Sequence, residues 1–251
     1  MTFLIPRPLA RALLGLCALV LSGCATVAQP DPRDPFESYN RGMTSFNERV
    51  DAMVLKPVAT AYQEAVPSVV RTGVRNFFAN LGDVWSFVNN VLQFKLEGAS
   101  SSFMRVNVNT FFGLGGVLDV ASELGIERYK QDFGLTLGHW GVPTGPYLVL
   151  PVLGPSTVRD TVALPVDMRG NVVRHVDPVS SRNNLYALGA VDARANLLRA
   201  SRVLDDAALD KYSFTRDVFL QVRSQTGDAR RDEPPADDGV LPPEPEPAPA
   251  R

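Results

Sequence analysis

Residues 67–94 read PSVVRTGVRNFFANLGDVWSFVNNVLQF, and the spacing of their apolar residues predicts a long amphipathic helix. Apolar residues recur every three or four positions and cover roughly 100° of arc or more on one side. These residues are Val70, Val74, Phe77, Phe78, Leu81, Val84, Trp85, Val88, Val91 and Leu92. Pro67 stands where this helix would begin, because a missing backbone N–H is harmless in the first turn.

The opposite side of this helix is polar but almost uncharged. It carries Asn76, Asn80 and Asn90, and Asp83 is the one charged residue between positions 75 and 95. Two interpretations stay open: a central helix packed on both sides, or a helix with protein on one flank and lipid on the other. The asparagines argue against a transmembrane span, because a buried amide without a partner is costly.

The rest of the chain predicts further helices and a mainly α, single-domain fold, since no internal repeat and no alternating strand series is present. A first helix follows Pro35 with one apolar face, and Lys56-Pro57 is expected to end it. Residues 98–121 predict a helix with a glycine break. Residues 180–201 and 204–222 predict ordinary helices with mixed charge, whereas residues 166–174 are ambiguous and could be extended.

Residues 132–151 read DFGLTLGHWGVPTGPYLVLP, and no formal charge follows Asp132 until Arg159. Four glycines and three prolines interrupt this stretch. It is too broken for a transmembrane helix and too apolar for an ordinary surface loop. We expect it to lie at a membrane boundary, where protein or a wet lumen satisfies its backbone groups.

The N-terminus predicts a lipoprotein signal peptide over residues 1–23. A basic start is followed by a short apolar run, and Leu21-Ser22-Gly23-Cys24 resembles the bacterial lipobox, in which the cysteine is acylated. The alternative is an ordinary secretory signal with a cysteine near its end. Residues 24–33 would then be a linker carrying palmitate-type chains on Cys24, and two or more chains give stable anchoring. A single mature cysteine allows no intramolecular disulfide.

The C-terminal residues 226–251 predict a disordered acidic tail. They contain seven prolines, seven acidic residues and no aromatic residue, so they cannot bury enough apolar surface to fold. Residues 34–225 remain as one helical domain of sufficient length for a core. The net charge of −2 and the lack of a basic run give no indication of nucleic-acid binding.

Catalytic patterns are missing from the sequence, so we expect no enzyme, no metal site and no cofactor. Two histidines and one mature cysteine cannot form a metal site of ordinary spacing without several carboxylates. Gly154-Pro155-Ser156 lacks the last glycine of a nucleophile elbow. His139 in its apolar surroundings is better explained as structural than as a proton shuttle. A Ser-His-Asp set brought together by folding stays an open alternative.

Several motifs together resemble the MlaA family of outer-membrane lipoproteins, also called VacJ. The resemblance covers residues 24–225 and is most specific in the charge-free stretch. The matching residues are Asp34-Pro35-Phe36-Glu37, Tyr39-Asn40-Arg41, Asn47, Asp51, Lys56-Pro57, Tyr62, Pro67, Arg71, Asn76-Phe77-Phe78, Asn80-Leu81, Asn89, Leu92-Gln93, Arg105, Asn109, Gly113, Gly116, Asp119, Asp132-Phe133-Gly134, Thr136-Leu137-Gly138, Trp140-Gly141-Val142, Gly145-Pro146-Tyr147, Leu150-Pro151, Gly154-Pro155-Ser156 and Arg159-Asp160.

The resemblance implies an all-α ring of amphipathic helices, with Gly/Pro-rich loops, embedded in the inner leaflet of the outer membrane around an amphipathic channel. It implies removal of mislocalised phospholipids from the outer leaflet and their transfer to a periplasmic carrier of the MlaC type, which maintains lipid asymmetry. A trimeric porin is a further partner in some bacteria. Ala25 after the cysteine is compatible with the outer membrane. The alternative function is a structural or scaffolding lipoprotein without lipid transfer.

Four residues are candidates for lining a lipid channel: Asn76, Asn80, Asn90 and Arg105. Arg105 stands alone in an uncharged segment, so it could meet a lipid phosphate or pair with Asp83 or Asp119 inside the fold. The three asparagines could line a lumen or bridge contacts between helices.

Overall fold

A computed structural model describes residues 31–227, and the side chains of residues 206, 207 and 225–227 are excluded from that description. The predicted signal peptide, Cys24, most of the linker and the tail beyond Gly227 lie outside the described residues. Within them, the elements are α2 (Glu37–Val50), η1 (Asp51–Leu55), α3 (Lys56–Ala65), α4 (Ser68–Leu92), α5 (Leu96–Phe111), α6 (Val120–Glu123), α7 (Phe133–His139), β1 (Tyr147–Leu150), β2 (Gly154–Thr157), α8 (Val158–Gly170), η2 (Val172–His175), α9 (Val179–Ala207) and α10 (Lys211–Gly227).

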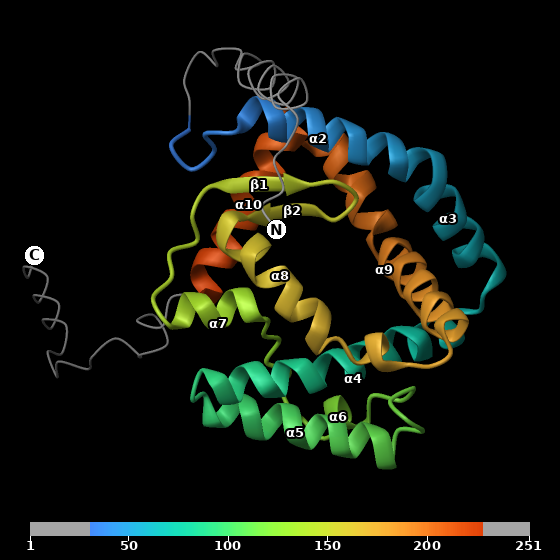
Figure 1. The fold of residues 1–251 in the computed structure, drawn as a ribbon. Helices are drawn as coiled ribbons and strands as arrows, with labels where there is room; N and C mark the ends of the chain where they lie inside the picture. The colour runs from blue at the N-terminus through green and yellow to red at the C-terminus, as the bar shows by residue number, and fades with distance from the viewer. Residues whose placement is uncertain (1–30, 228–251) are drawn as a thin grey trace, which may run out of the picture.

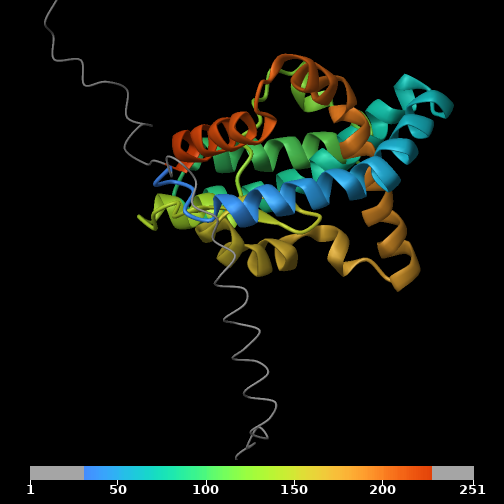
Figure 2. The same ribbon diagram turned by 90° about the horizontal axis from the view of Figure 1, so that it is seen from above.

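The helices form a ring, which confirms the predicted mainly α architecture (Figure 1). The arc of α2 and α3 continues into α9 and α4, and α8, α7 and the β-hairpin close the other side (Figure 1). α5 folds back along the outer side of α4. In the view from above, α10 and α8 lie on opposite sides of α2 (Figure 2).

The prediction that Lys56-Pro57 ends the first helix is wrong. The chain stays helical from Glu37 to Ala65, because the π-helical turn η1 links α2 to α3. Pro57 lies in the first turn of α3, where it costs little.

Two further expectations need correction. Residues 166–174 are not extended: α8 continues to Gly170 and a 3-10 turn follows. Tertiary contacts explain this, because the Trp85 indole donates to Asp167 and a Cβ on Gly170 would collide with the Trp85 ring. The last two helices separate near residues 208–210 rather than 202–203.

A short antiparallel hairpin, β1–β2, lies inside the charge-free stretch and was missed by the sequence reasoning. Two asparagines of α2, about two helical turns apart, form hydrogen bonds with the unpaired backbone groups of this hairpin. Asn40 accepts from Val149 N (2.8 Å) and donates to Tyr147 O (3.1 Å). Asn47 accepts from Val152 N (2.7 Å) and donates to Leu150 O (2.8 Å). Each amide therefore acts as one residue of a missing neighbouring strand.

The core around this hairpin is conventional. Tyr147, Val149, Tyr212 and Leu220 form a buried apolar cluster between β1 and α10. The rings of Tyr147 and Tyr212 meet edge to face, with centroids 6.1 Å apart. Such aromatic packing contributes stability beyond the buried area alone.

Candidate functional site

The contact between α4 and α5 is polar, which reverses the usual order of a protein interior. The buried polar side chains of these two helices are Asn80, Asp83, Ser86, Asn89, Asn90, Gln93, Ser102, Arg105 and Asn109. Of these, Asn89 and Gln93 bond to Thr136 of α7 rather than to α5. Buried polar side chains are informative because apolar residues normally occupy such positions. Small residues accompany them, and Gly98 of α5 lies directly against the Asn90 amide.

Arg105 is the centre of this polar interface and is 1% exposed. Its guanidinium bonds to Asp119 (2.7 and 3.0 Å), Asp83 (3.3 Å) and Ser122 Oγ (3.2 Å), and also donates to Ile126 O. Burial opposes ionisation of Asp119, but hydrogen bonds from Ser122 and Asn109 and the charge of Arg105 lower its pKa to about 2. Of the two alternatives for Arg105, the structure shows the ion pair within the fold.

The three candidate asparagines also have hydrogen-bond partners within the protein. Asn76 donates to Val117 O (3.1 Å), Asn80 to Thr110 Oγ1 (3.2 Å), and Asn90 to Ser86 O (2.9 Å) and Tyr129 O (3.2 Å). Gly116, at a φ of 94°, lets the backbone approach Asn80, where a Cβ would lie 2.6 Å from its amide nitrogen. Their contact with lipid stays an untested prediction.

The helices α4 and α5 form a helical hairpin, and the outer side of this helical hairpin is apolar. Large side chains there are about half to four-fifths exposed: Val91, Phe94, Leu96, Phe103, Met104, Phe111, Phe112 and Leu114. A water-facing surface rarely presents so many together, and large exposed apolar patches mark contact with protein or membrane. Within the described part of the chain, no helix is long and apolar enough to span a bilayer.

A cavity of about 780 Å³, which we call the central cavity, lies where α4, α8 and α9 approach one another. One part of its wall is apolar, with Phe78, Leu81 and Trp85 from α4 and Leu185 and Tyr186 from α9. The other part is charged or polar: Asp83, Arg128, Lys130, Gln131, Asp132, Asp167 and Asn171. This volume is in the range of small-molecule sites, and a wall of two characters suits an amphiphilic ligand.

Fixed hydrogen bonds position the charged wall. Asp167 Oδ1 accepts from Trp85 Nε1 and from Phe133 N, both at 2.8 Å, and burial raises the pKa of this carboxyl. Arg223 of α10 bridges Asp132 (2.6 Å) and Asp160 (2.8 Å), so the start of α7 is tied to α8. The second oxygen of Asp167 has no partner among the described residues.

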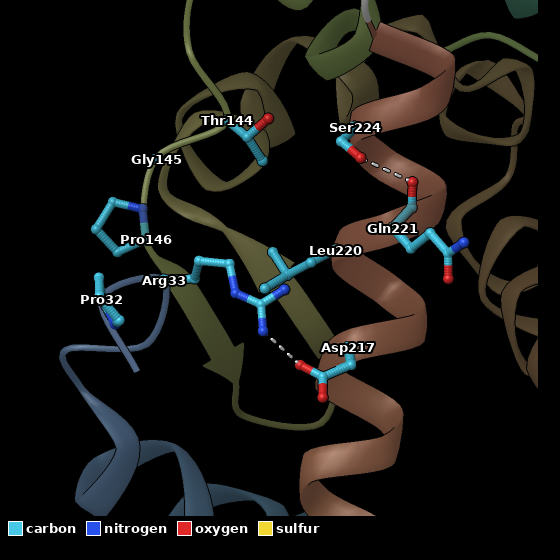
Figure 3. A pocket seen from close by; sticks show the side chains of 9 residues that line it. All are labelled: Pro32, Arg33, Thr144, Gly145, Pro146, Asp217, Leu220, Gln221 and Ser224. Atoms are coloured by element: carbon cyan, nitrogen blue, oxygen red, sulfur yellow. Dashed lines mark hydrogen bonds and ion pairs between the residues drawn. The ribbon is translucent and has the colours of Figure 1, made fainter. Parts of the chain in front are cut away.

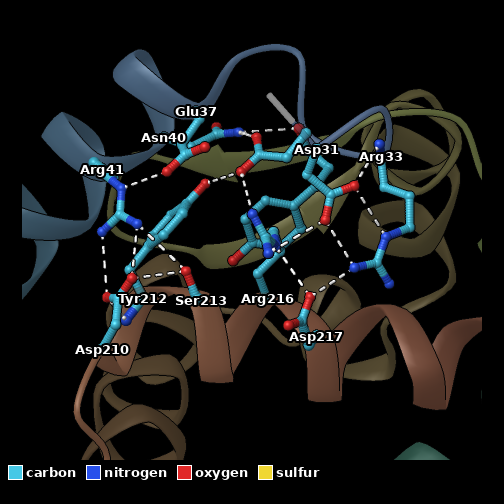
Figure 4. A network of polar contacts seen from close by, with 12 residues as sticks. Asp31, Arg33, Glu37, Asn40, Arg41, Asp210, Tyr212, Ser213, Arg216 and Asp217 are labelled. Atoms are coloured by element: carbon cyan, nitrogen blue, oxygen red, sulfur yellow. Dashed lines mark hydrogen bonds and ion pairs between the residues drawn. The ribbon is translucent and has the colours of Figure 1, made fainter. Parts of the chain in front are cut away.

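A second polar network fastens the start of the domain to α10 (Figure 4). Arg216 pairs with Asp31 and Asp34, both at 3.3 Å, and Tyr212 donates to Asp34. Arg41 pairs with Asp210 at 2.7 Å. The segment that leads from the predicted acylated cysteine is thus held to the last helix. Beside it, Arg33, Thr144, Pro146 and Leu220 line a separate cavity of about 830 Å³ (Figure 3).

The sequence reasoning found the polar interface but missed most of the central cavity. Asn80, Asn90 and Arg105 do not line this cavity, and Asn76 borders an apolar groove between α4 and α9 instead. Neither Arg128 nor Lys130 was singled out from the sequence, and Asp167 falls in the ambiguous segment 166–174. The sequence did contain a signal for these residues. A charged residue at the end of a charge-free segment needs a partner or water, so such residues are candidates for the wall of a polar cavity.

Ser156, which the sequence analysis weighed as part of a nucleophile elbow, has its hydrogen-bond partners close by in the chain. Ser156 Oγ bonds to Thr161 Oγ1 (3.0 Å) and Thr157 O (3.3 Å), and no histidine of residues 31–227 forms a hydrogen bond with it. In the same part of the chain, no group of three His, Cys, Asp or Glu residues is placed to hold a metal ion.

Comparison with known proteins identifies the family. A model of the MlaA lipoprotein family matches residues 32–226. A Haemophilus influenzae protein named intermembrane phospholipid transport system lipoprotein MlaA is 35% identical over 220 residues, which is 82% of this chain and 85% of that protein. The Escherichia coli K12 protein of the same name is 34% identical over 215 residues, 83% of this chain and 84% of its own.

The fold is also shared with a solved structure. That structure concerns the basis for maintenance of bacterial outer membrane lipid asymmetry, and its chain superposes with a TM-score of 0.64 at 32% identity. The match covers 78% of this chain and 99% of that one. On the family match and these relatives, the chain belongs to the MlaA lipoprotein family.

Proposed function

We propose that this protein is a non-enzymatic outer-membrane lipoprotein that removes mislocalised phospholipids from the outer leaflet. It hands them to a periplasmic lipid carrier of the MlaC type and so maintains lipid asymmetry. Its relatives are named for intermembrane phospholipid transport, which describes transfer rather than catalysis. The proposal includes a trimeric porin as a partner in the membrane.

The observation that carries the proposal is the reversed burial of α4 and α5. Apolar side chains cover the outside of this hairpin, and amides and ions fill its inside. Helices in lipid associate through small and polar residues, because lipid provides no hydrophobic driving force between them. A hairpin of this kind is stable with its outside in acyl chains, and the amphipathic cavity then lies on the inner side of the ring.

The anchoring part of the proposal concerns residues outside the described range. Residues 1–23 are removed as a signal peptide, and Cys24 carries acyl chains at the end of linker 24–33. This places the ring, residues 34–225, in the inner leaflet at the periplasmic side. Residues 226–251 form an acidic tail. The polar network around Arg216 supports this arrangement, since it fastens the start of the ring to α10.

Deletion of the gene tests the function. We expect outer-leaflet phospholipid to rise and resistance to detergents to fall, and unchanged levels of both would contradict the proposal. A second test blocks the central cavity and so separates transport from scaffolding. Ala190 of α9 lines the central cavity, so Ala190→Trp would fill it. Ala193→Trp is the control, because Ala193 is exposed on the same helix and does not line the cavity. Transport predicts that only Ala193→Trp restores asymmetry, and a scaffold predicts that both do.

A further inference from the structure

The central cavity holds one cation and one carboxylate oxygen that the fold leaves unpaired. Asp132 is neutralised by Arg223, and Asp83 by Arg105 and Arg128. What remains is the Lys130 ammonium, which forms no ion pair with a described residue, and Asp167 Oδ2. A ligand with one negative and one positive group could pair with both the Lys130 ammonium and Asp167 Oδ2.

The two unpaired groups differ in how firmly they are placed. The Asp167 carboxylate is fixed through its other oxygen by Trp85 and by the backbone of Phe133. Burial raises the pKa of this carboxyl, so an arriving cation stabilises its ionised form. Lys130 is exposed on a flexible stem, and Arg128 beside it keeps a third of its side chain exposed. A mobile cationic rim suits a phosphate, and a fixed carboxylate suits a primary ammonium.

The apolar wall adds the third requirement. Phe78, Leu185 and Tyr186 adjoin the charged wall in the same cavity. A soluble phosphate ester would leave this surface wet, whereas a lipid would cover it with the beginning of its acyl chains. A quaternary ammonium would gain nothing from hydrogen bonds to a carboxylate, so the ligand chemistry is that of a primary amine.

We infer that the cavity recognises the zwitterionic phosphoethanolamine headgroup, with its ammonium at Asp167 and its phosphate at Lys130 and Arg128. This inference rests on the proposed function and names the lipid class that the site prefers. Anionic lipids of the phosphatidylglycerol type lack the ammonium, so they leave Asp167 unpaired and place a net negative charge beside it.

Photocrosslinking in vesicles of equal phosphatidylethanolamine and phosphatidylglycerol tests the inference. The full lipoprotein carries a photoreactive phenylalanine at Tyr186, which lines the cavity, or at Phe112, which lies on the apolar outside. Mass spectrometry then counts the crosslinked headgroups. We expect the ethanolamine-to-glycerol ratio at position 186 to exceed that at position 112 by about threefold, as for one partly exposed ion pair.

Three variants identify the contacts. Asp167→Asn keeps an acceptor for Trp85 and Phe133, so the fold is preserved, and we expect the ratio at position 186 to fall to that at position 112. Lys130→Gln should lower crosslinks of both lipids at position 186, because both carry a phosphate. Glu64→Gln, an exposed carboxylate on α3, is the matched control and should change neither value.

The outcomes separate this inference from the proposed function. Equal ratios at the two positions, with lipid crosslinks at both, overturn the headgroup preference and leave lipid transport intact. A ratio that Asp167→Asn does not change also overturns it. Crosslinks at position 112 without any at position 186 show that lipid does not enter the cavity, and then both the inference and the transport route fail.

Discussion

Two regions of this ring are built on opposite rules. Around the β-hairpin, an apolar cluster is buried beside an aspartate–arginine pair, Asp34 with Arg216. Another charged pair there, Arg33 with Asp217, lies at the surface. Between α4 and α5, the buried side chains are polar, and phenylalanines such as Phe111 are exposed. The first arrangement suits water, and the second suits acyl chains. The difference indicates that one part of the chain is suited to water and another part to lipid. The predictions below test this distinction.

The largest effect is expected at Arg105. Arg105→Met removes the buried cation that Asp83 and Asp119 share, and it leaves the buried Asp83 with only the partly exposed Arg128. We expect a loss of about 3–5 kcal/mol in the free energy of unfolding, as for other broken buried ion pairs. Denaturant unfolding in lipid nanodiscs measures it.

The matched control is Arg33→Met, which removes an exposed pair with Asp31 and Asp217. Its expected cost is about 1 kcal/mol or less. Equal costs for the two variants would contradict the view that the α4–α5 interface depends on its buried ions.

An intermediate effect is expected at Asn40, which holds the edge of β1. Asn40→Ala removes its bonds to Val149 N and Tyr147 O and leaves buried backbone groups unpaired, at a cost of about 1–3 kcal/mol. Asn107→Ala on α5 removes only an exposed bond to its own helix, so it should change stability by less than about 0.5 kcal/mol. Thermal unfolding would refute this if the two amides proved interchangeable.

An alkaline pH effect is expected in the core of the β-hairpin. Burial raises the pKa of Tyr147 from 10.0 to about 12. The folded state therefore keeps the phenolic proton longer than the unfolded state, so stability is full below pH 10 and is lost as pH rises from 10.0 toward about 12. Tyr147→Phe should reduce this alkaline loss, measured as the unfolding midpoint across that pH range. An identical alkaline loss in the variant would contradict it.

The smallest effect on folding is expected for the exposed phenylalanines. Phe111→Ser and Phe112→Ser should change the free energy of unfolding in detergent by less than about 0.5 kcal/mol, because neither side chain is buried. Both should nevertheless weaken binding of the protein to lipid vesicles, measured by flotation. Unchanged flotation together with a large loss of stability would place these side chains in a protein core.

The helices were predictable from the sequence, and the ring was implied by the family resemblance, but the surroundings of the two sides of α4 were not predictable. Most of its apolar stripe is partly buried, with Phe78, Leu81 and Trp85 on the cavity wall, and the amides Asn80 and Asn90 on its other side are buried. Periodicity identifies two faces of a helix, and the solvent decides which face is inside. A sequence alone does not state that solvent, so the choice between protein and lipid stayed open.

The cavity was less predictable for a related reason. Asp167 is far from Arg128 and Asp132 in the chain, and the tertiary bonds made by Trp85 and Arg223 hold these groups on one wall. The hairpin β1–β2 was missed because its edge is satisfied by side chains of α2 rather than by another strand. Such pairings carry no local pattern.

Spin labels at Phe103 and Phe111, with Arg199 of α9 as the exposed charged reference, test the central claim most directly. The protein is placed in vesicles, and collisions with oxygen and with a water-soluble nickel complex are compared by electron paramagnetic resonance. We predict that the labels on α5 collide with oxygen and are shielded from nickel, whereas the label at position 199 shows the reverse. Nickel collisions on α5 as frequent as those at position 199 would contradict the account.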